Sequence, residues 1–168
     1  RTPLYRKYLL QFSENAPEIP RDVINKIYKQ LTKVHIMSSM SVKPTPIAQI
    51  LRHEREHKWA SYAVRITKMI NNEVVPVLTT ADIDRLVYRF QRTTEVFEGI
   101  ISKDRKKIMN FEFLTRKFLQ LDGRNDLAHS FACHKTKTVL TQADTRIIEC
   151  CHFLKDTDDL NWDIRRSC

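Results

Sequence analysis

Two histidines four residues apart occur in the string His53-Glu54-Arg55-Glu56-His57. On one helix this spacing can bind zinc, and an adjacent carboxylate can then act as the general base of a hydrolase. At about 100° per residue, however, Glu54 falls in line with the apolar residues before it, and both histidines lie beside arginines. We therefore interpret the string as a solvated, ion-paired helix face and expect no metal site there.

The cysteines form a second candidate cluster for metal binding or nucleophilic chemistry. They are Cys133, which precedes a histidine, the pair Cys150 and Cys151, which precedes another, and Cys168. No two have the CxxC spacing typical of structural zinc sites, and nothing supplies a third group to orient a cysteine and histidine pair. The pair falls on the apolar stripe of a predicted helix, so we expect buried, inert thiols. We predict no catalytic residue, no metal and no cofactor, and a reducing, intracellular compartment.

Three arginines, Arg85, Arg89 and Arg92, lie on one line of a predicted helix. On a helical wheel they fall within about 60° of one another and opposite the apolar stripe of that helix. We therefore expect all three to face water or a ligand. Such a line can form several charge-assisted hydrogen bonds to phosphates, which makes it a candidate nucleic-acid-binding element.

The predicted basic surface continues beyond this helix, because residues 85–117 hold nine basic side chains against four acidic ones. The six that follow the arginines are Lys103, Arg105, Lys106, Lys107, Arg116 and Lys117. We predict that all nine contact nucleic acid electrostatically, with weak sequence preference, because no helix-turn-helix pair can be identified. Two alternatives stay open: a solvated helix whose charge Glu95 and Glu98 partly offset, and a surface that binds an acidic protein.

Composition limits the classes of protein to which the chain can belong. Its 168 residues include 29 Lys and Arg against 20 Asp and Glu, a formal charge of +9 that attracts polyanions. The only glycines, Gly99 and Gly123, cannot build a phosphate-cradling GxxxxGK or GxGxxG loop, which excludes nucleotide-binding enzymes of those classes. No apolar run approaches the 18 or so residues that a bilayer span needs, so we expect no membrane partner. We also expect no small-molecule substrate.

Helical spacing of apolar residues recurs along the chain, whereas strict strand-like alternation does not. It predicts helices near residues 4–12, 20–34, 45–57, 62–70, 80–99, 110–121 and 141–154, and a short helical turn within 126–133. Val74–Leu78 surrounds Pro76 and is expected to be an extended linker. We predict an all-α fold, a single compact domain of about six to eight helices over residues 1–168, with an acidic C-terminal segment at 156–168.

From Lys103, the string KDRKKIMNFEFLTRKFLQLDGRNDL resembles the late transcription factor 3-like family of poxviruses and other large DNA viruses. That family shows a basic KDRK-like loop, an aromatic-rich helix, a leucine-glycine close and then an acidic residue. Further motifs occur in the family's order: Ile19-Pro20, Thr45-Pro46, Pro76-x-Leu78-Thr79 and Leu160-x-Trp162. The resemblance covers about Tyr5 to Trp162.

The resemblance implies a protein that switches on late viral genes by acting with a virus-encoded RNA polymerase or other late transcription factors. In fuller members a cysteine-rich zinc ribbon precedes the helical region; since this chain begins at Arg1 and shows no ribbon, we interpret it as an excerpt or processed form. It departs from the family where Asp122 replaces an aliphatic residue before Gly123, and where Phe131–Thr136 replaces a more aliphatic segment. These changes concern the docking surface more than the fold.

The resemblance and the basic residues together predict a binding module and not an enzyme. Its partners would be DNA and components of late transcription, inside the infected host cell, either in the viral factory or in the nucleus, and it could be packaged in the virion. The competing hypothesis is a virion structural protein, or a protein directed against the host, that uses the same basic face against acidic protein.

Overall fold

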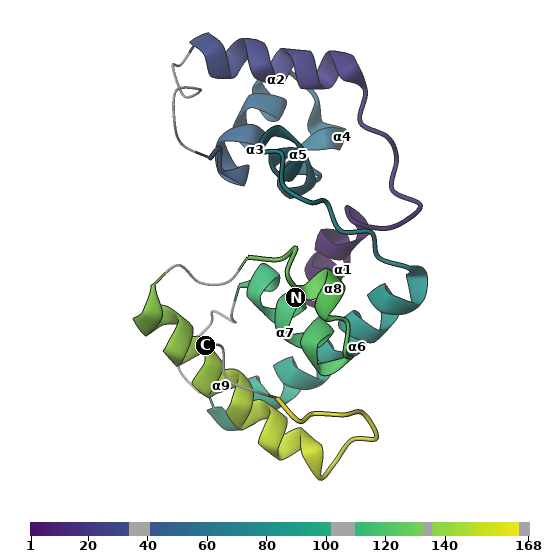
Figure 1. Ribbon diagram of the computed structural model, residues 1–168, viewed down its shortest axis with the longest axis vertical. Coiled ribbons are helices and arrows are strands. Elements are labelled where there is room, and N and C mark those ends of the chain that lie inside the picture. The colour runs from purple at the N-terminus through teal and green to yellow at the C-terminus, as the bar shows by residue number, and fades with distance from the viewer. Residues whose placement is uncertain (34–40, 102–109, 133–135, 165–168) are drawn as a thin grey trace. The chain divides into compact units, whose positions relative to one another are not determined.

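A computed structural model describes residues 1–33, 41–101, 110–132 and 136–164 of the chain (Figure 1). Within these ranges every regular element is helical, which confirms the predicted all-α class. The described ranges contain nine α-helices, more than the six to eight predicted, because α4 (His57–Ala60) and α8 (Asn125–Ala128) have only four residues each. None of the described helices has the length and apolarity that crossing a bilayer requires.

The contacts of the chain divide it into two compact units. We call residues 6–80 the N-terminal unit, and residues 1–5 together with 81–168 the C-terminal unit. The boundaries fall within α1 (Thr2–Leu10) and at the start of α6 (Thr80–Val96), so the first residues of the chain belong to the same unit as its second half. That the whole chain acts as one domain stays a prediction.

The N-terminal unit is built around α2 (Arg21–Lys33), α3 (Pro44–His53) and α5 (Ala63–Ile70). The helix α2 follows Pro20, whose fixed φ suits a helix start, and its apolar residues recur every three or four positions, so that one side can be buried. The core of the unit contains Ile19, Val23, Ile27, Leu31, Ile47, Leu51, Trp59, Ala63 and Ile66. The predicted extended linker forms one parallel bridge, in which the Leu78 amide donates to the Phe12 carbonyl at 2.8 Å.

The helix α3 ends in a Schellman motif that places an arginine where glycine is usual. The Glu56 amide donates to the Leu51 carbonyl at 2.7 Å, and the Arg55 amide donates to the Arg52 carbonyl at 3.1 Å. This pattern requires a left-handed backbone between the two donors, and Arg55 has φ 61°. The helix α5 ends in the same way at Asn72, with φ 54°, but asparagine tolerates this region better than arginine does.

The C-terminal unit packs α6, the π-helix η2 (Phe97–Ile101), α7 (Phe111–Leu121), α8 and α9 (Lys137–Lys155). The first residues of the chain complete its core. The Tyr5 ring stacks on Phe90 with centroids 4.3 Å apart, and its hydroxyl shares a 2.9 Å hydrogen bond with Thr115. Burial raises the pKa of Tyr5, more than this hydrogen bond lowers it, so the phenol is neutral at neutral pH.

The ends of α7 follow the prediction, and the start of α9 does not. The Asn110 side chain caps α7 by accepting from the Glu112 amide at 2.8 Å, and Gly123 follows the helix with φ 71°. The helix α9 begins at Lys137, four residues before the predicted start at residue 141. Thr141 and Asp144, whose spacing resembles a capping box, both lie inside α9, and Asp144 is buried in the unit.

Candidate nucleic-acid interface

The three arginines of α6 have three different environments. Arg85 is exposed, as predicted. Arg89 is only 1% exposed, and Arg92 is partly covered. The predicted line of three solvent-facing arginines is therefore wrong, because one member lies in the protein interior and another is held by neighbouring carboxylates.

Arg89 lies inside the C-terminal unit, where its guanidinium has three partners. Its Nε and Nη2 donate to Oδ1 of Asp122 at 3.0 and 2.5 Å, and its Nη1 donates to the Asn161 carbonyl at 2.7 Å. The Trp162 ring centroid lies 4.8 Å from Cζ. A buried charge persists only when it is paired and hydrogen-bonded, and this one is. Arg89 therefore holds the fold together and cannot contact a phosphate outside it.

Arg92 is held by two carboxylates. Its Nε donates to Oδ2 of Asp158 at 3.0 Å and its Nη1 donates to Oε2 of Glu95 at 2.6 Å, and these hydrogen bonds raise the pKa of Arg92. Burial alone would raise the pKa of Asp158. Hydrogen bonds from the Leu160 amide, Arg92 and the Tyr88 hydroxyl outweigh burial, so that the pKa of Asp158 lies below its usual value. Asp158 therefore stays charged and competes with any outside phosphate for Arg92.

The two basic residues predicted on α7 also have partners within the protein. The Lys117 ammonium lies 2.7 Å from Oδ1 of Asp144 and 5.7 Å from the centroid of the Phe113 ring. Lys117 is 1% exposed, so it does not lie on the surface as a contact with nucleic acid would require. Arg116 is half-buried and donates to the Phe131 carbonyl at 3.1 Å. The basic loop of Lys103, Arg105, Lys106 and Lys107 lies outside the described residues.

A segment distant in sequence covers the arginine side of α6, and the periodicity of one helix cannot show this. The acidic stretch after α9 turns back within the C-terminal unit and brings Asp158, Asn161 and Trp162 to the arginines (Figure 1). One signal was present in the sequence. Val96 falls about 20° from Arg85 on the helical wheel and is 7% exposed, so an apolar residue marks that side as covered.

The histidine string does not form one helical face, contrary to the prediction. The helix α3 ends at His53, Arg55 is left-handed, and α4 begins at His57. Across the described parts of the chain, no three His, Cys, Asp or Glu side chains gather in an arrangement that could hold a metal ion. Cys150 and Cys151 are buried as predicted, and burial raises the pKa of both thiols to about 12. They are therefore protonated and unreactive at neutral pH.

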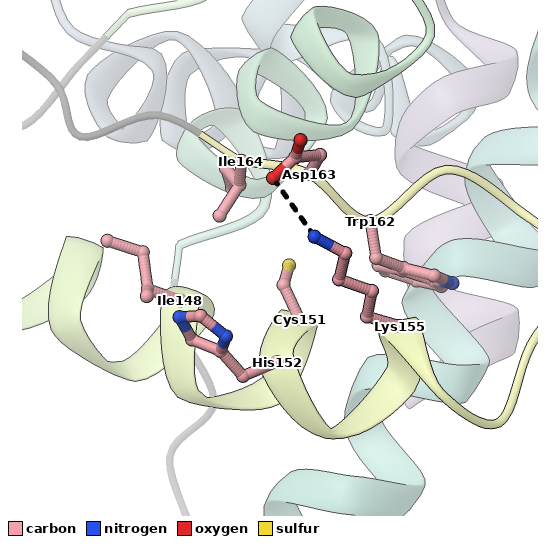
Figure 2. Close-up of a pocket in the computed structure, with 7 residues that line it drawn as sticks. All are labelled: Ile148, Cys151, His152, Lys155, Trp162, Asp163 and Ile164. Carbon is pink, nitrogen blue, oxygen red and sulfur yellow. Dashed lines mark ion pairs between the residues drawn. The ribbon is translucent and has the colours of Figure 1, made fainter.

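A small pocket lies beside the buried face of α9 (Figure 2). Its volume is about 30 Å³, enough for one water molecule and too small for a substrate. The Lys155 ammonium and the Asp163 carboxylate form an ion pair at 3.6 Å in its lining. Cys151 and His152 also line the pocket. The Cys151 thiol in this wall is buried and protonated, so it is a poor nucleophile at neutral pH.

Comparison with known families assigns the chain. A family model described as Poxvirus Late Transcription Factor VLTF3 like matches residues 1–163. The chain belongs to this family. The match confirms the resemblance found in the motifs and includes both units of the fold.

One relative of this VLTF3-like chain is a curated protein of Paramecium bursaria Chlorella virus 1 named "Putative transcription factor". The two are 24% identical over 150 residues, which are 89% of this chain and 40% of that protein. The chain thus spans two fifths of the length of the relative it matches. No solved structure matches the chain.

The position at which this VLTF3-like chain departs from the family motif now has a structural explanation. Asp122 stands where the resemblance led us to expect an aliphatic residue, and Asp122 is the carboxylate that pairs with Arg89. The departure therefore supports an internal ion pair, and it places the substituted residue under the cover of the C-terminal segment. Its side chain is 7% exposed, so Asp122 does not alter a docking surface.

Proposed function

We propose that the chain is a binding module of a viral late transcription factor, which helps a virus-encoded RNA polymerase to transcribe late genes. The observation that carries this proposal is the family match over residues 1–163. The name of the chlorella-virus relative points the same way. The proposed contact with DNA is electrostatic and weakly sequence-dependent, in keeping with a formal charge of +9.

The structural roles of the buried cysteines and charged residues support the proposal that the module binds a partner and does not catalyse a reaction. The thiols of Cys150 and Cys151 are buried and protonated. The buried charges of Arg89 and Lys117 neutralise buried carboxylates. These groups stabilise the fold, which leaves the exposed side chains to meet a partner.

The predicted binding surface shrinks accordingly. We retain Arg85 and Arg116, which are exposed and half-buried respectively, and the loop residues Lys103, Arg105, Lys106 and Lys107 as candidates. Arg89 and Lys117 are removed from it, and Arg92 contributes only if Asp158 and Glu95 release it. The place of action that we propose is the infected host cell, at the viral factory or in the nucleus, with packaging in the virion as a further possibility to test.

The test is a titration of a labelled DNA duplex with the full chain over roughly 50 to 200 mM salt, beside a pull-down of the purified virus-encoded RNA polymerase. The proposal expects DNA affinity to fall steeply as salt rises, and the polymerase to be retained. DNA binding that does not change with salt would contradict electrostatic contact. Retention of acidic protein without DNA or polymerase would favour the competing virion or host-directed role.

A further inference from the structure

The two units differ in their net positive charge. Within the described residues of the C-terminal unit, ion pairs engage Arg1, Arg89, Arg92, Lys117, Arg124 and Lys155. By sequence the N-terminal unit has 12 Lys and Arg against 6 Asp and Glu, a formal charge of +6, whereas the C-terminal unit has 17 against 14, a charge of +3. Most of the net charge of the chain therefore belongs to the N-terminal unit, outside the region that sequence analysis singled out.

Basic side chains and carboxylates differ in exposure at the turn between α3 and α4. We call residues 52–58 the α3–α4 turn. Its side chains Arg52, His53, Arg55, His57 and Lys58 are all exposed. The two carboxylates interleaved with them, Glu54 and Glu56, are only half-exposed, and both are bound by side chains of α2.

The contacts with α2 hold both carboxylates, and of the exposed side chains of the turn His53 alone lies near one of them, with its Nδ1 3.6 Å from Oε1 of Glu54. Lys26 donates to Oε1 of Glu56 at 2.5 Å, and Gln30 donates to Oε1 of Glu54. The hydrogen bond from Gln30 lowers the pKa of Glu54, against a smaller opposing effect of burial. In the described chain, neither Arg52 nor Arg55 has a carboxylate partner. The carboxylates of the turn thus serve packing between helices, and its guanidinium groups stay available.

Arg55 occupies a position that its own backbone disfavours. It is the left-handed residue of the Schellman motif of α3, with φ 61°, where glycine avoids the clash between Cβ and backbone. A residue in such a position persists only because its surroundings fix it, and such positions cluster at functional sites. Here the surroundings are two backbone hydrogen bonds that glycine would make equally well. An arginine in this place therefore adds an exposed charge but does not stabilise the end of the helix.

We propose that the α3–α4 turn is a binding surface for the phosphate groups of duplex DNA, with Arg52, Arg55 and Lys58 as the contacting residues. The inference rests on the proposed function only in taking DNA as the partner. Arginine forms bidentate hydrogen bonds with phosphate, and lysine binds it as a point charge. The Lys58 ammonium lies 4.7 Å from the centroid of the Trp59 ring, a cation–π contact that keeps the charge near the turn.

The deciding experiment replaces one residue in a way that should move stability and binding in opposite directions. In Arg55→Gly the left-handed backbone is no longer strained, so the midpoint of thermal unfolding should rise by about 2 to 4 °C. The same change removes one phosphate contact. We expect affinity for a labelled DNA duplex to fall, and the slope of log affinity against log salt to decrease in magnitude by about 0.9.

A triple variant, Arg52→Gln with Arg55→Gly and Lys58→Gln, measures the whole surface. Its salt slope should decrease in magnitude by about 2.7, and its affinity at 0.1 M salt should fall by roughly 100-fold. The matched control is Lys7→Gln with Arg21→Gln and Lys43→Gln, which removes three exposed cations from the same unit. Lys43 precedes the start of α3, about 14 Å along the axis from Arg52. The control should lose no more than a few-fold in affinity.

Three results would overturn the inference, and they differ from a failure of the proposed function. Equal losses in the triple variant and the control would mean that only net charge matters. An Arg55→Gly chain that is stabilised and binds DNA as before would remove the role of Arg55. Binding of poly-glutamate, with the same residue dependence and without DNA binding, would assign the turn to an acidic protein. If instead the unaltered chain binds no DNA at any salt, the DNA contact of the proposed function fails as well.

Discussion

Lys117 and Asp144 form an ion pair with almost no contact with solvent, the two side chains being 1% and 5% exposed. Asp144→Ala leaves the ammonium buried without its carboxylate, and we expect it to lower the free energy of unfolding by about 3 to 5 kcal/mol. Urea denaturation of the purified variant measures this. The double variant Lys117→Met with Asp144→Leu, which removes both charges of this pair, should recover most of the loss. If it recovers nothing, the cost arises from packing volume and not from charge.

The buried thiols make stability depend on pH above neutrality. Burial raises the pKa of Cys150 and Cys151 from 9.0 to about 12, so the folded chain keeps two protons that the unfolded chain releases. Their contribution is complete below pH 9 and is lost as the pH rises from 9 towards 12. Between about pH 8 and 10 the unaltered chain should lose roughly 2 to 3 kcal/mol more than Cys150→Ala with Cys151→Ala. Parallel losses in the two proteins would show that these thiols already ionise in the fold.

At the scale of elements, the two glycines allow the effect of backbone strain to be measured by itself, because the surroundings of both are equally open. A Cβ at Gly123 or at Gly99 would meet no atom within 4 Å, but only Gly123 has a positive φ, 71°. Gly123→Ala should therefore cost about 1 kcal/mol through strain alone, whereas Gly99→Ala should be neutral or slightly stabilising. Thermal unfolding of the two variants gives the comparison. Equal destabilisation by both would contradict the left-handed end of α7.

Apolar spacing was sufficient to predict most helices, because burial of one side determines where a helix forms. The helix α2 and the helix α7 with its Asn110 cap and Gly123 end were predicted closely. Predictions failed where the deciding partner is distant in sequence. Asp144 resembles part of a capping box until its pairing with Lys117 is known, and the histidine string resembles one helix until the Schellman motif at Arg55 interrupts it.

The binding surface could be predicted less well than the helices, for the same physical reason. A charged side chain opposite an apolar stripe faces solvent only if no other segment covers it. The acidic segment after α9 covers Arg89 and partly covers Arg92. Within α6 itself, only the position of Val96 indicates that this side is covered. Conversely, the exposure of the cations of the α3–α4 turn follows from the end of α3 in the Schellman motif at Arg55, and helical periodicity does not predict that end.

At the scale of the whole molecule, the described part of the acidic C-terminal segment, residues 156–164, is a structural part of the C-terminal unit. Removing residues 156–168 would deprive Arg89 of the Asn161 carbonyl and the Trp162 ring, and would release Arg92 from Asp158. We expect a chain that ends at Lys155 to be less stable by about 3 kcal/mol or more, since it exposes a large aromatic contact and weakens a buried charge pair. Chemical denaturation tests this. An unchanged free energy of unfolding would mean that the segment only rests on the surface.

The place of Tyr5 in the C-terminal core determines the order in which this protein can mature. A ribosome releases Tyr5 long before it has made Phe90 and Thr115, the residues against which that ring finally lies. Residues 6–80 have a core of their own and can fold while synthesis continues, whereas the C-terminal unit is complete only when the segment around Tyr5 packs against residues that are made later. Folding of the C-terminal unit therefore depends on a contact between residues far apart in the sequence, a feature that slows folding, and on Tyr5 staying available until that contact forms.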